Sequence, residues 1–138
     1  MTRPGEKRNP RGACLMILRE SDRKVLLVRR SDLVTKAGHW AFPGGGVEAG
    51  ETEIETAMRE GNEELGGLPP DLVVEGEPEW YAEGPFFCFA TFLGITRDTE
   101  WKPKLNDEND DWTWADPRRM PTPALEGTKQ AVKALVPR

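Results

Sequence analysis

The chain has 138 residues, of which 37% are hydrophobic and 31% charged, and its formal net charge is −5. This length predicts one domain with a core of its own. The acidic balance argues against a protein that binds nucleic-acid duplexes in general, and no apolar run approaches the length of a membrane span. The cysteines Cys14 and Cys88 lie in apolar runs, so we expect unpaired thiols and a cytoplasmic protein.

Residues 1–10 are polar and basic and contain proline, which predicts a flexible N-terminal arm before a single domain over residues 11–138. The expected strands are short runs rich in branched and aromatic residues, at 13–18, 25–29, 39–42, 71–74, 79–82, 86–95 and 111–114. The run 86–95 is the strongest, and we expect it inside the sheet. A C-terminal helix is expected within 122–135. Strands before and after a central helix predict an α/β fold with a mixed sheet between helices.

The segment from Pro43 to Gly67 contains the strongest local signals in the chain. Three glycines follow Pro43, and because glycine does not support a helix and weakens a strand, we expect a turn or bulge over 44–46. Thr52 and Glu55 have the spacing of a capping box, which predicts the start of a helix. Apolar residues then recur with helical spacing, and the glycines at 66 and 67 predict the helix end.

Three glutamates, Glu60, Glu63 and Glu64, share one side of this helix at spacings of three and four residues. Like charges at these spacings destabilise a helix, by about 0.2–0.5 kcal/mol per pair. A divalent cation would turn this repulsion into coordination, because hard cations prefer carboxylate oxygens. The alternative is a solvated acidic helix face, with Arg59 as the only cation of the segment.

Seven residues of the segment follow the pattern G-x5-E-x7-R-E-U-x-E-E-x-G-U, in which U is apolar; they are Gly45, Glu51, Arg59, Glu60, Glu63, Glu64 and Gly66. This pattern resembles the box of the Nudix hydrolase family. The two U positions differ, since they hold Gly61 and Gly67, and this departure concerns helix packing more than metal chemistry. The resemblance implies a Nudix-type α/β/α sandwich and a Mg²⁺-dependent pyrophosphohydrolase. It also implies Mn²⁺ as a substitute ion and, by analogy, a homodimer.

In this family the metal ions are held mainly by glutamates of the box helix. Carried over to this sequence, Glu60, Glu63 and Glu64 would bind Mg²⁺ together with the carbonyl of Gly44. Glu60 and Glu63 would also be catalytic, and Arg59 would act with them by orienting the carboxylates through ion pairs. The resemblance leaves open which carboxylate is the general base.

A second acidic run, LNDENDDW at 105–112, precedes the last predicted strand. Nudix proteins commonly place a further metal-binding or catalytic carboxylate in this region. The resemblance therefore implies that role for Glu108, with Asp107 as the nearest alternative. A solvated acidic loop without such a role is the other interpretation.

Residues outside the box must select the substrate. Arg30 and Lys36 are candidates for phosphate contacts, and Trp40 and Tyr81 are candidates for stacking on a base, with surface solubility and packing as the alternatives. We expect a small nucleotide of the nucleoside di- or triphosphate type. A dinucleoside polyphosphate, coenzyme A or a nucleotide sugar stays open as the substrate. A catalytically silent Nudix-like domain that senses a nucleotide is the alternative from a different class.

Overall fold

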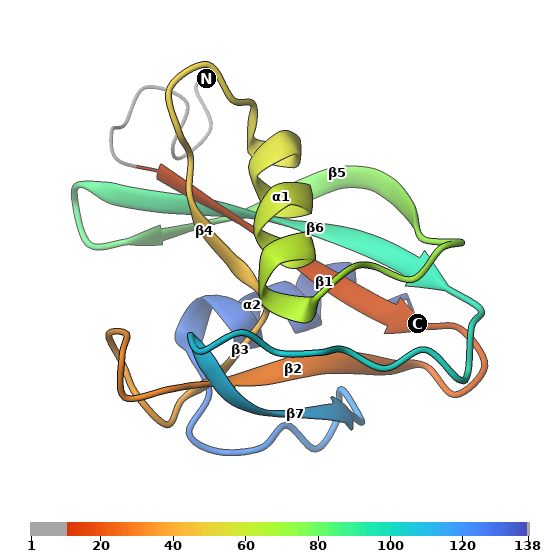
Figure 1. Ribbon diagram of the computed structural model, residues 1–138. Coiled ribbons are helices and arrows are strands. Elements are labelled where there is room, and N and C mark those ends of the chain that lie inside the picture. Colours follow the sequence, from red (N-terminus) through yellow and green to blue (C-terminus); the bar gives the residue numbers. More distant parts are fainter. Residues whose placement is uncertain (1–10, 138) are drawn as a thin grey trace.

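Seven strands form one mixed sheet, and a helix packs on each of its faces (Figure 1). The computed structural model describes residues 11–137. The elements follow one another as β1 (Arg11–Arg19), β2 (Lys24–Arg30), β3 (Trp40–Ala41), β4 (Gly44–Gly46), α1 (Glu53–Leu65), β5 (Val73–Glu83), β6 (Phe87–Thr96), β7 (Asn109–Ala115) and α2 (Glu126–Leu135). The predicted arm, residues 1–10, lies outside the described residues.

Strand β1 lies in the middle of the sheet. One edge of β1 pairs in parallel with β6 along its whole length. The other edge is shared, because β4 pairs with residues 12–14 and β2 with residues 18–19, both antiparallel. β5 continues the sheet beyond β6, so β6 is an interior strand as predicted, while β3 and β7 both pair with β2. β1 and β2 therefore separate toward the start of β1, and β4 lies in the space between them (Figure 1).

Strand β1 contributes to two hydrophobic cores, because successive side chains of a strand point to opposite faces. Leu15 and Ile17 are fully buried on the face covered by α1. Met16 and Leu18 are buried on the other face, where they pack with Val132 of α2. The alternation of β1 thus confirms the predicted α/β fold, with a mixed sheet between two helices.

The glycines at 44–46 form strand β4, so the prediction of a turn or bulge there is wrong. Gly44 lies so close to β1 that a Cβ atom on it would be 2.7 Å from Sγ of Cys14 and would collide with the carbonyl oxygen of Ala13. None of the three glycines has a positive φ. Glycine is required here for the close approach of two backbones and not for its conformational freedom.

Strand β5 is continuous, whereas the sequence predicts two separate strands at 71–74 and 79–82. Its pairing with β6 has a register irregularity between Glu75 and Glu79. Gly76, inside that irregularity, has φ +73°, a conformation that residues with a Cβ atom rarely adopt. A local bulge of this kind interrupts the pairing without ending the strand.

Helix α1 begins and ends where the sequence predicts. Thr52 accepts a hydrogen bond from the backbone N–H of Glu55, and the Glu55 carboxylate accepts one from the N–H of Thr52, which completes the capping box. Gly66 ends the helix in the left-handed conformation, with φ 66°. At Gly61 an added Cβ atom would lie 3.2 Å from Leu15 Cδ2, so this departure from the box sequence brings the helix close to the sheet.

Neither Cys14 nor Cys88 is part of a disulfide. Burial is the main cause that raises the pKa of Cys14 to about 12, and the nearby charge of Glu64 adds to it. The Cys14 thiol is therefore a poor nucleophile near neutral pH. No helix within residues 11–137 is long and apolar enough to cross a membrane.

Candidate functional site

Three carboxylates from distant parts of the chain converge beside α1. Glu60 and Glu64 come from the C-terminal half of that helix, and Glu108 comes from the segment just before β7. One oxygen atom of each carboxylate lies within 4.8 Å of the other two. The two acidic runs of the sequence thus meet at one point. Asp110 and Asp111 of β7 are engaged elsewhere, since both form ion pairs with Arg29, and Asp107 is not one of the three converging carboxylates.

Backbone hydrogen bonds place Glu108 next to α1. The carbonyl oxygens of Leu65 and Glu64, at the end of the helix, accept hydrogen bonds from the N–H groups of Lys104 (2.8 Å) and Asn106 (3.3 Å). From the other side, the backbone N–H of Ser31 donates to the carbonyl oxygen of Glu108 at 2.9 Å. The segment 104–108 is therefore fixed both to the helix and to the end of β2. The acidic loop is an ordered part of the site.

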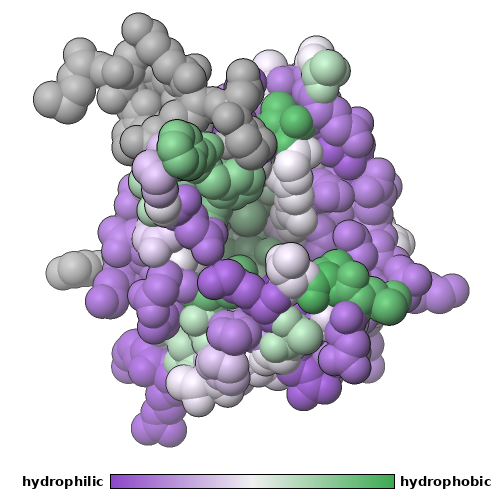
Figure 2. Space-filling view, turned by 90° about the vertical axis from the view of Figure 1, so that its left-hand side faces the viewer, coloured by the Kyte–Doolittle hydropathy of each residue, from purple (hydrophilic) through white to green (hydrophobic). Residues whose placement is uncertain are grey.

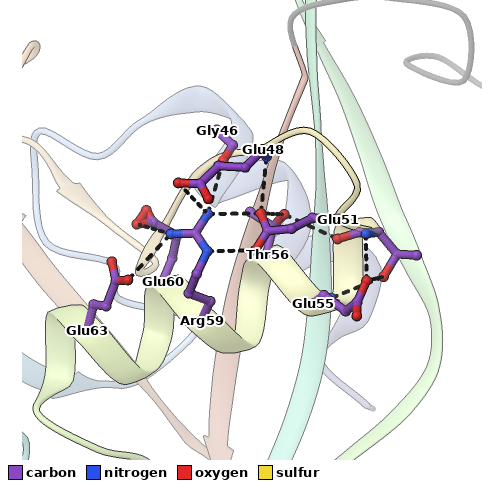
Figure 3. Close-up of polar contacts among 9 residues, drawn as sticks. Gly46, Glu48, Glu51, Glu55, Thr56, Arg59, Glu60 and Glu63 are labelled. Carbon is purple, nitrogen blue, oxygen red and sulfur yellow. Dashed lines mark hydrogen bonds and ion pairs between the residues drawn. The ribbon is translucent and has the colours of Figure 1, made fainter.

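Arg59 is surrounded by glutamates (Figure 3). It donates to both oxygens of Glu51, from Nε at 2.6 Å and from Nη2 at 3.0 Å. Its Nη1 lies 3.5 Å from a carboxylate oxygen of Glu60 and 3.5 Å from one of Glu63. The hydrogen bond from Arg59 is the main cause that lowers the pKa of Glu51 to about 2. Glu51 therefore stays ionised and anchors Arg59, which in turn holds two glutamates of the helix.

Glu63 lies at the edge of the cluster. It is not one of the three converging carboxylates, and its side chain is 52% exposed where it meets Arg59. Its negative charge is still close enough to help raise the pKa of Glu60. The helix thus presents Glu60 and Glu64 to the interior of the site and Glu63 to its rim.

Glu64 is buried, with 5% of its surface exposed, and both of its oxygens accept a hydrogen bond. Oε1 accepts from Nδ2 of Asn109 at 2.8 Å, and Oε2 accepts from the backbone N–H of Gly44 at 2.9 Å. Burial is the largest influence and raises the pKa of Glu64 to about 7, although these two donors oppose it. Burial also raises the pKa of Glu60 to about 7, against the opposing charge of Arg59.

Two glycines of β4 make room for the two helix carboxylates. The backbone N–H of Gly44 binds Glu64, as described above. A Cβ atom on Gly45 would collide with Oε2 of Glu60 and would lie 2.6 Å from its Cδ. The first two residues of β4 are thus in direct contact with the carboxylate cluster, and only glycine at 45 leaves Glu60 in place.

A divalent cation fits the carboxylate cluster. Its three members are hard oxygen ligands, which Mg²⁺ and Mn²⁺ prefer. Within residues 11–137, the only cationic side chain paired with any of the three is Arg59, which reaches Glu60 at 3.5 Å. Burial is the largest cause that raises the pKa of both Glu60 and Glu64, and neighbouring carboxylates, Glu108 among them, add to it. A bound cation would offset this repulsion between the carboxylates.

We expect the stability of the metal-free protein to fall as the pH rises from about 4.5 to about 7. Glu60 and Glu64 have an ordinary pKa of 4.5 and a native pKa of about 7, so in this interval the native state binds more protons than the unfolded state. Glu51 has the opposite effect, but its native pKa of about 2 and ordinary pKa of 4.5 place that effect mainly below this interval. A cation must displace these protons, so Mg²⁺ should stabilise the protein more at higher pH.

Thermal denaturation at about pH 5.5 and about pH 8, with and without Mg²⁺, measures this effect. At a concentration of 100 times Kd, Mg²⁺ should raise the melting temperature by about 8 °C at the higher pH, and by much less at the lower pH. Glu64→Gln should reduce both the pH dependence and the Mg²⁺ response. An equal Mg²⁺ response at both pH values would contradict the role of these two carboxylates.

A cavity of about 300 Å³ opens where β1 and β2 diverge. Gly44 and Gly45 form part of its wall, and Phe87, Phe89 and Leu125 give it an apolar lining. Figure 2 shows this side of the molecule, where hydrophobic residues surround a hollow and hydrophilic residues lie at its margin. The same two glycines touch the carboxylate cluster, so the cavity and the carboxylates adjoin through β4.

Two of the four predicted substrate contacts, Arg30 and Lys36, line this cavity. Arg30 donates to the carbonyl oxygen of Thr35 at 2.6 Å and to its hydroxyl at 3.1 Å, which fixes the loop between β2 and β3. The ammonium group of Lys36 lies 3.5 Å from a carboxylate oxygen of Glu83, at the end of β5. Two cationic groups therefore lie beside an apolar cavity.

The other two predicted contacts, Trp40 and Tyr81, are not among the residues that line the cavity. The Trp40 ring packs beside the guanidinium group of Arg29, 5.7 Å from the ring centroid. The Tyr81 ring packs against Phe89, with 5.5 Å between their centroids. In the structure both aromatic side chains have packing partners. Packing is the alternative to base stacking that the sequence analysis names for them.

A larger hollow of about 620 Å³ lies between the β1–β2 turn, the segment after β7 and the end of α2. Both acidic and basic side chains line it, and none of the three clustered carboxylates does. The smaller cavity is therefore the one that adjoins the carboxylate cluster.

Sequence reasoning missed two residues that build the site, Asn109 and Ser31. Asn109 lies within the acidic run that the sequence singles out, but its amide is uncharged and no local pattern distinguishes it. Ser31 binds the acidic segment twice, since its hydroxyl also donates to the carbonyl oxygen of Asp107 at 2.7 Å. Both contacts join segments more than 40 residues apart, so the spacing of neighbouring residues in the sequence does not predict either contact.

Comparisons with known proteins identify the class of this chain, hydrolases that act on pyrophosphate bonds. A model of the NUDIX domain matches residues 8–135. An RNA pyrophosphohydrolase from Rickettsia bellii (strain OSU 85-389) is 32% identical over 122 residues, which cover 75% of this chain and 73% of the relative. The chain belongs to the Nudix family. The predictions of that family and of a hydrolase are confirmed.

Solved structures show the same fold. A Nudix hydrolase from M. smegmatis, RenU, has a TM-score of 0.74 at 23% identity, with 94% of this chain and 83% of that chain covered. A C. elegans Ap4A hydrolase has a TM-score of 0.66 at 26% identity, with 79% and 81% covered. The fold of the described residues is therefore the Nudix fold.

Proposed function

We propose that the protein is a Mg²⁺-dependent pyrophosphohydrolase that cleaves a phosphoanhydride bond of a nucleoside di- or triphosphate-type substrate. One observation carries the proposal: three carboxylate oxygens within 4.8 Å of one another lie beside a cavity with an aromatic lining. A nucleotide has an apolar, flat base and a charged phosphate chain. The cavity suits the first, and a cation held by the carboxylates suits the second.

The proposed metal ligands are Glu60, Glu64 and Glu108, with the carbonyl of Gly44 and with Glu63 at the rim. When bound, the cation neutralises phosphate charge and lowers the pKa of a water molecule. One of the carboxylates, Glu63 or Glu108, then accepts the proton of the attacking water. Their position at the open side of the cluster supports this choice, because Glu64 is buried and already accepts two hydrogen bonds.

Arg59 acts in this proposal by holding the carboxylates of Glu60 and Glu63 in place. Its paired hydrogen bonds with Glu51 fix the guanidinium group, whose other side faces Glu60 and Glu63. Arg30 and Lys36 are the proposed contacts for phosphate oxygens. Lys36 would exchange its partner Glu83 for the substrate, since both side chains are about half exposed.

A second candidate substrate is an RNA that carries a phosphoanhydride at its 5′ end. Several relatives are named RNA pyrophosphohydrolase, among them proteins from Rickettsia bellii and Erythrobacter litoralis. The net charge of −5 favours the small nucleotide, because an RNA chain adds a phosphate charge with every residue. We infer a cytoplasmic location for either activity, because neither cysteine is part of a disulfide.

The purified protein should be assayed for phosphate and pyrophosphate release with Mg²⁺ and with Mn²⁺. The substrates are nucleoside triphosphates, dinucleoside polyphosphates, nucleotide sugars, coenzyme A and an RNA with a 5′-triphosphate. We expect metal-dependent hydrolysis that is fastest with a small nucleotide. Faster hydrolysis of the RNA would favour the second candidate. If no substrate is hydrolysed but nucleotides still bind, the protein is a nucleotide sensor and the proposed activity is wrong.

A further inference from the structure

A buried amide lies directly behind the carboxylate cluster. Asn109, the first residue of β7, is 6% exposed. Its Nδ2 donates to Oε1 of Glu64 at 2.8 Å, while the backbone of Gly44 donates to the other oxygen. Glu64 alone would be free to rotate about its side-chain bonds. With one donor on each oxygen, both from strands, the plane of its carboxylate is fixed.

An irregularity in β7 directs Asn109 inward. Arg30 pairs with Asn109, but its neighbour Arg29 pairs with Asp111, so Asp110 is an extra residue in the strand. Successive side chains of a regular strand alternate between faces, whereas here Asp110 and Asp111 are both exposed. Arg29 holds both of them, at 2.7 Å and 3.9 Å. Bulges of this kind redirect a side chain, and this one leaves Asn109 pointing at Glu64.

The chemistry of an amide suits this position. An ionised carboxylate has about four lone-pair directions, and a single hydrogen bond on each oxygen leaves the others free. A carboxylate in place of Asn109 would add a further negative charge to the cluster. An apolar side chain would leave a buried oxygen of Glu64 without a donor. An uncharged donor fixes Glu64 without competing for a cation.

We propose that Asn109 is a positioning residue that holds the Glu64 carboxylate in the orientation needed to bind a divalent cation. Asn109 does not contact the cation itself. It acts through Glu64, and the extra residue Asp110 directs it there. The inference rests on the proposed metal site. It goes beyond the Nudix box because Asn109 lies 45 residues after Glu64.

The decisive variant is Asn109→Leu, which keeps the number and branching of the side-chain heavy atoms, offers no donor and leaves no space for water. Binding of Mn²⁺ to the protein without substrate is measured by titration calorimetry. Loss of a partner that orients a metal ligand typically weakens metal binding by about 10–100-fold, and we expect a Kd increase in this range. Asn62→Leu, at an exposed position on α1, is the matched control and should bind Mn²⁺ like the wild type.

Two further variants separate loss of the hydrogen bond from loss of folding. Asn109→Ala is smaller and replaces Asn109→Leu if that variant does not fold, with the same expected loss. Asn109→Ser retains a hydroxyl donor and should restore part of the affinity. In the assay, the Mn²⁺ concentration for half-maximal rate should rise, while the substrate KM at saturating Mn²⁺ stays unchanged. If Asn109 had only a structural role, the variants would have a lower melting temperature, but the half-maximal Mn²⁺ concentration would not rise while KM stayed constant.

A folded Asn109→Leu or Asn109→Ala variant with a wild-type Kd for Mn²⁺ would overturn the inference. If the wild type binds Mn²⁺ but hydrolyses none of the substrates, the proposed function fails while the role of Asn109 stands. If the wild type does not bind Mn²⁺ at all, the metal site and the role of Asn109 both fail.

Discussion

Replacing Glu64 by glutamine should lower the rate of hydrolysis by about 100-fold, which corresponds to about 2.7 kcal/mol of transition-state stabilisation. Glu64 is buried in the cluster, and its two oxygens accept hydrogen bonds from Asn109 and Gly44. Glutamine removes the negative charge that a cation requires. It also has only one acceptor oxygen, so one of the two donors would face an amide NH₂ group. The rate is measured at saturating Mg²⁺ with the best substrate of the panel.

The matched control is Glu75→Gln, the same chemical change at an exposed position on β5. This variant should retain the wild-type rate. Glu64→Gln should remain folded, because Glu64 with a pKa of about 7 is already largely uncharged in the metal-free protein at lower pH. A folded Glu64→Gln enzyme that keeps more than about a third of the wild-type rate would show that Glu64 does not serve the reaction.

Helix α1 was predictable because its signals are local. The capping box of Thr52 and Glu55 and the left-handed Gly66 lie within the helix or next to it, and all appear in the structure as the sequence predicts. The convergence of Glu60 and Glu64 follows from helix geometry, since residues four apart share a face. The carboxylate face and the ion pair between Arg59 and its glutamates therefore belong to one continuous stretch of chain.

Strand β4 was not predictable in the same way, because a run of glycines is compatible with opposite structures. Glycine permits a turn through its conformational freedom, and it permits close approach through its missing side chain. Only the positions of Cys14 and Glu60, which lie on other elements, show that the second property is used at Gly44 and Gly45. Tertiary contacts decide between a turn and a strand here, and these contacts cannot be predicted from the spacing of neighbouring residues.

Tertiary contacts also decide which acidic residues join the carboxylate cluster and which do not. Glu63 satisfies the box pattern as well as Glu64 does, yet it lies at the rim beside Arg59 while Glu64 is buried. In the acidic run before β7, Glu108 joins the cluster and Asp110 binds Arg29. The sequence identifies these acidic residues as candidates because of their charge. The extra residue in β7 and the hydrogen bonds of the loop determine the direction in which each one points.

The cluster places like charges together in the native state, and this is the reason to expect a response to cations. Burial and neighbouring carboxylates raise the pKa of both Glu60 and Glu64, so ionising them costs free energy in the metal-free protein. Arg59 offsets part of this cost for Glu60 alone, since no ion pair joins a described cation to Glu64. We therefore expect a cation from outside the chain to bind at this cluster.

Strand β4 allows the geometry of the site to be changed without changing its charge. A Cβ atom on Gly45 would collide with Oε2 of Glu60, which is the end of a flexible side chain. The backbone can therefore stay in place while the carboxylate moves away. At the next residue, Gly46, an added Cβ atom meets nothing within 4 Å. Two adjacent glycines of one strand thus offer a test and its control.

Gly45→Ala should fold normally and lose about 100-fold in kcat, because displacement of a reacting or coordinating group by about 1 Å has effects of this size. It should also bind Mn²⁺ more weakly, since Glu60 can no longer meet Glu64 and Glu108. Gly46→Ala should keep most of the activity and the affinity for Mn²⁺. The measurements are steady-state kinetics, calorimetric Mn²⁺ titration and thermal denaturation of both variants. Equal activity in Gly45→Ala and Gly46→Ala would mean that the position of Glu60 against β4 is not needed for catalysis.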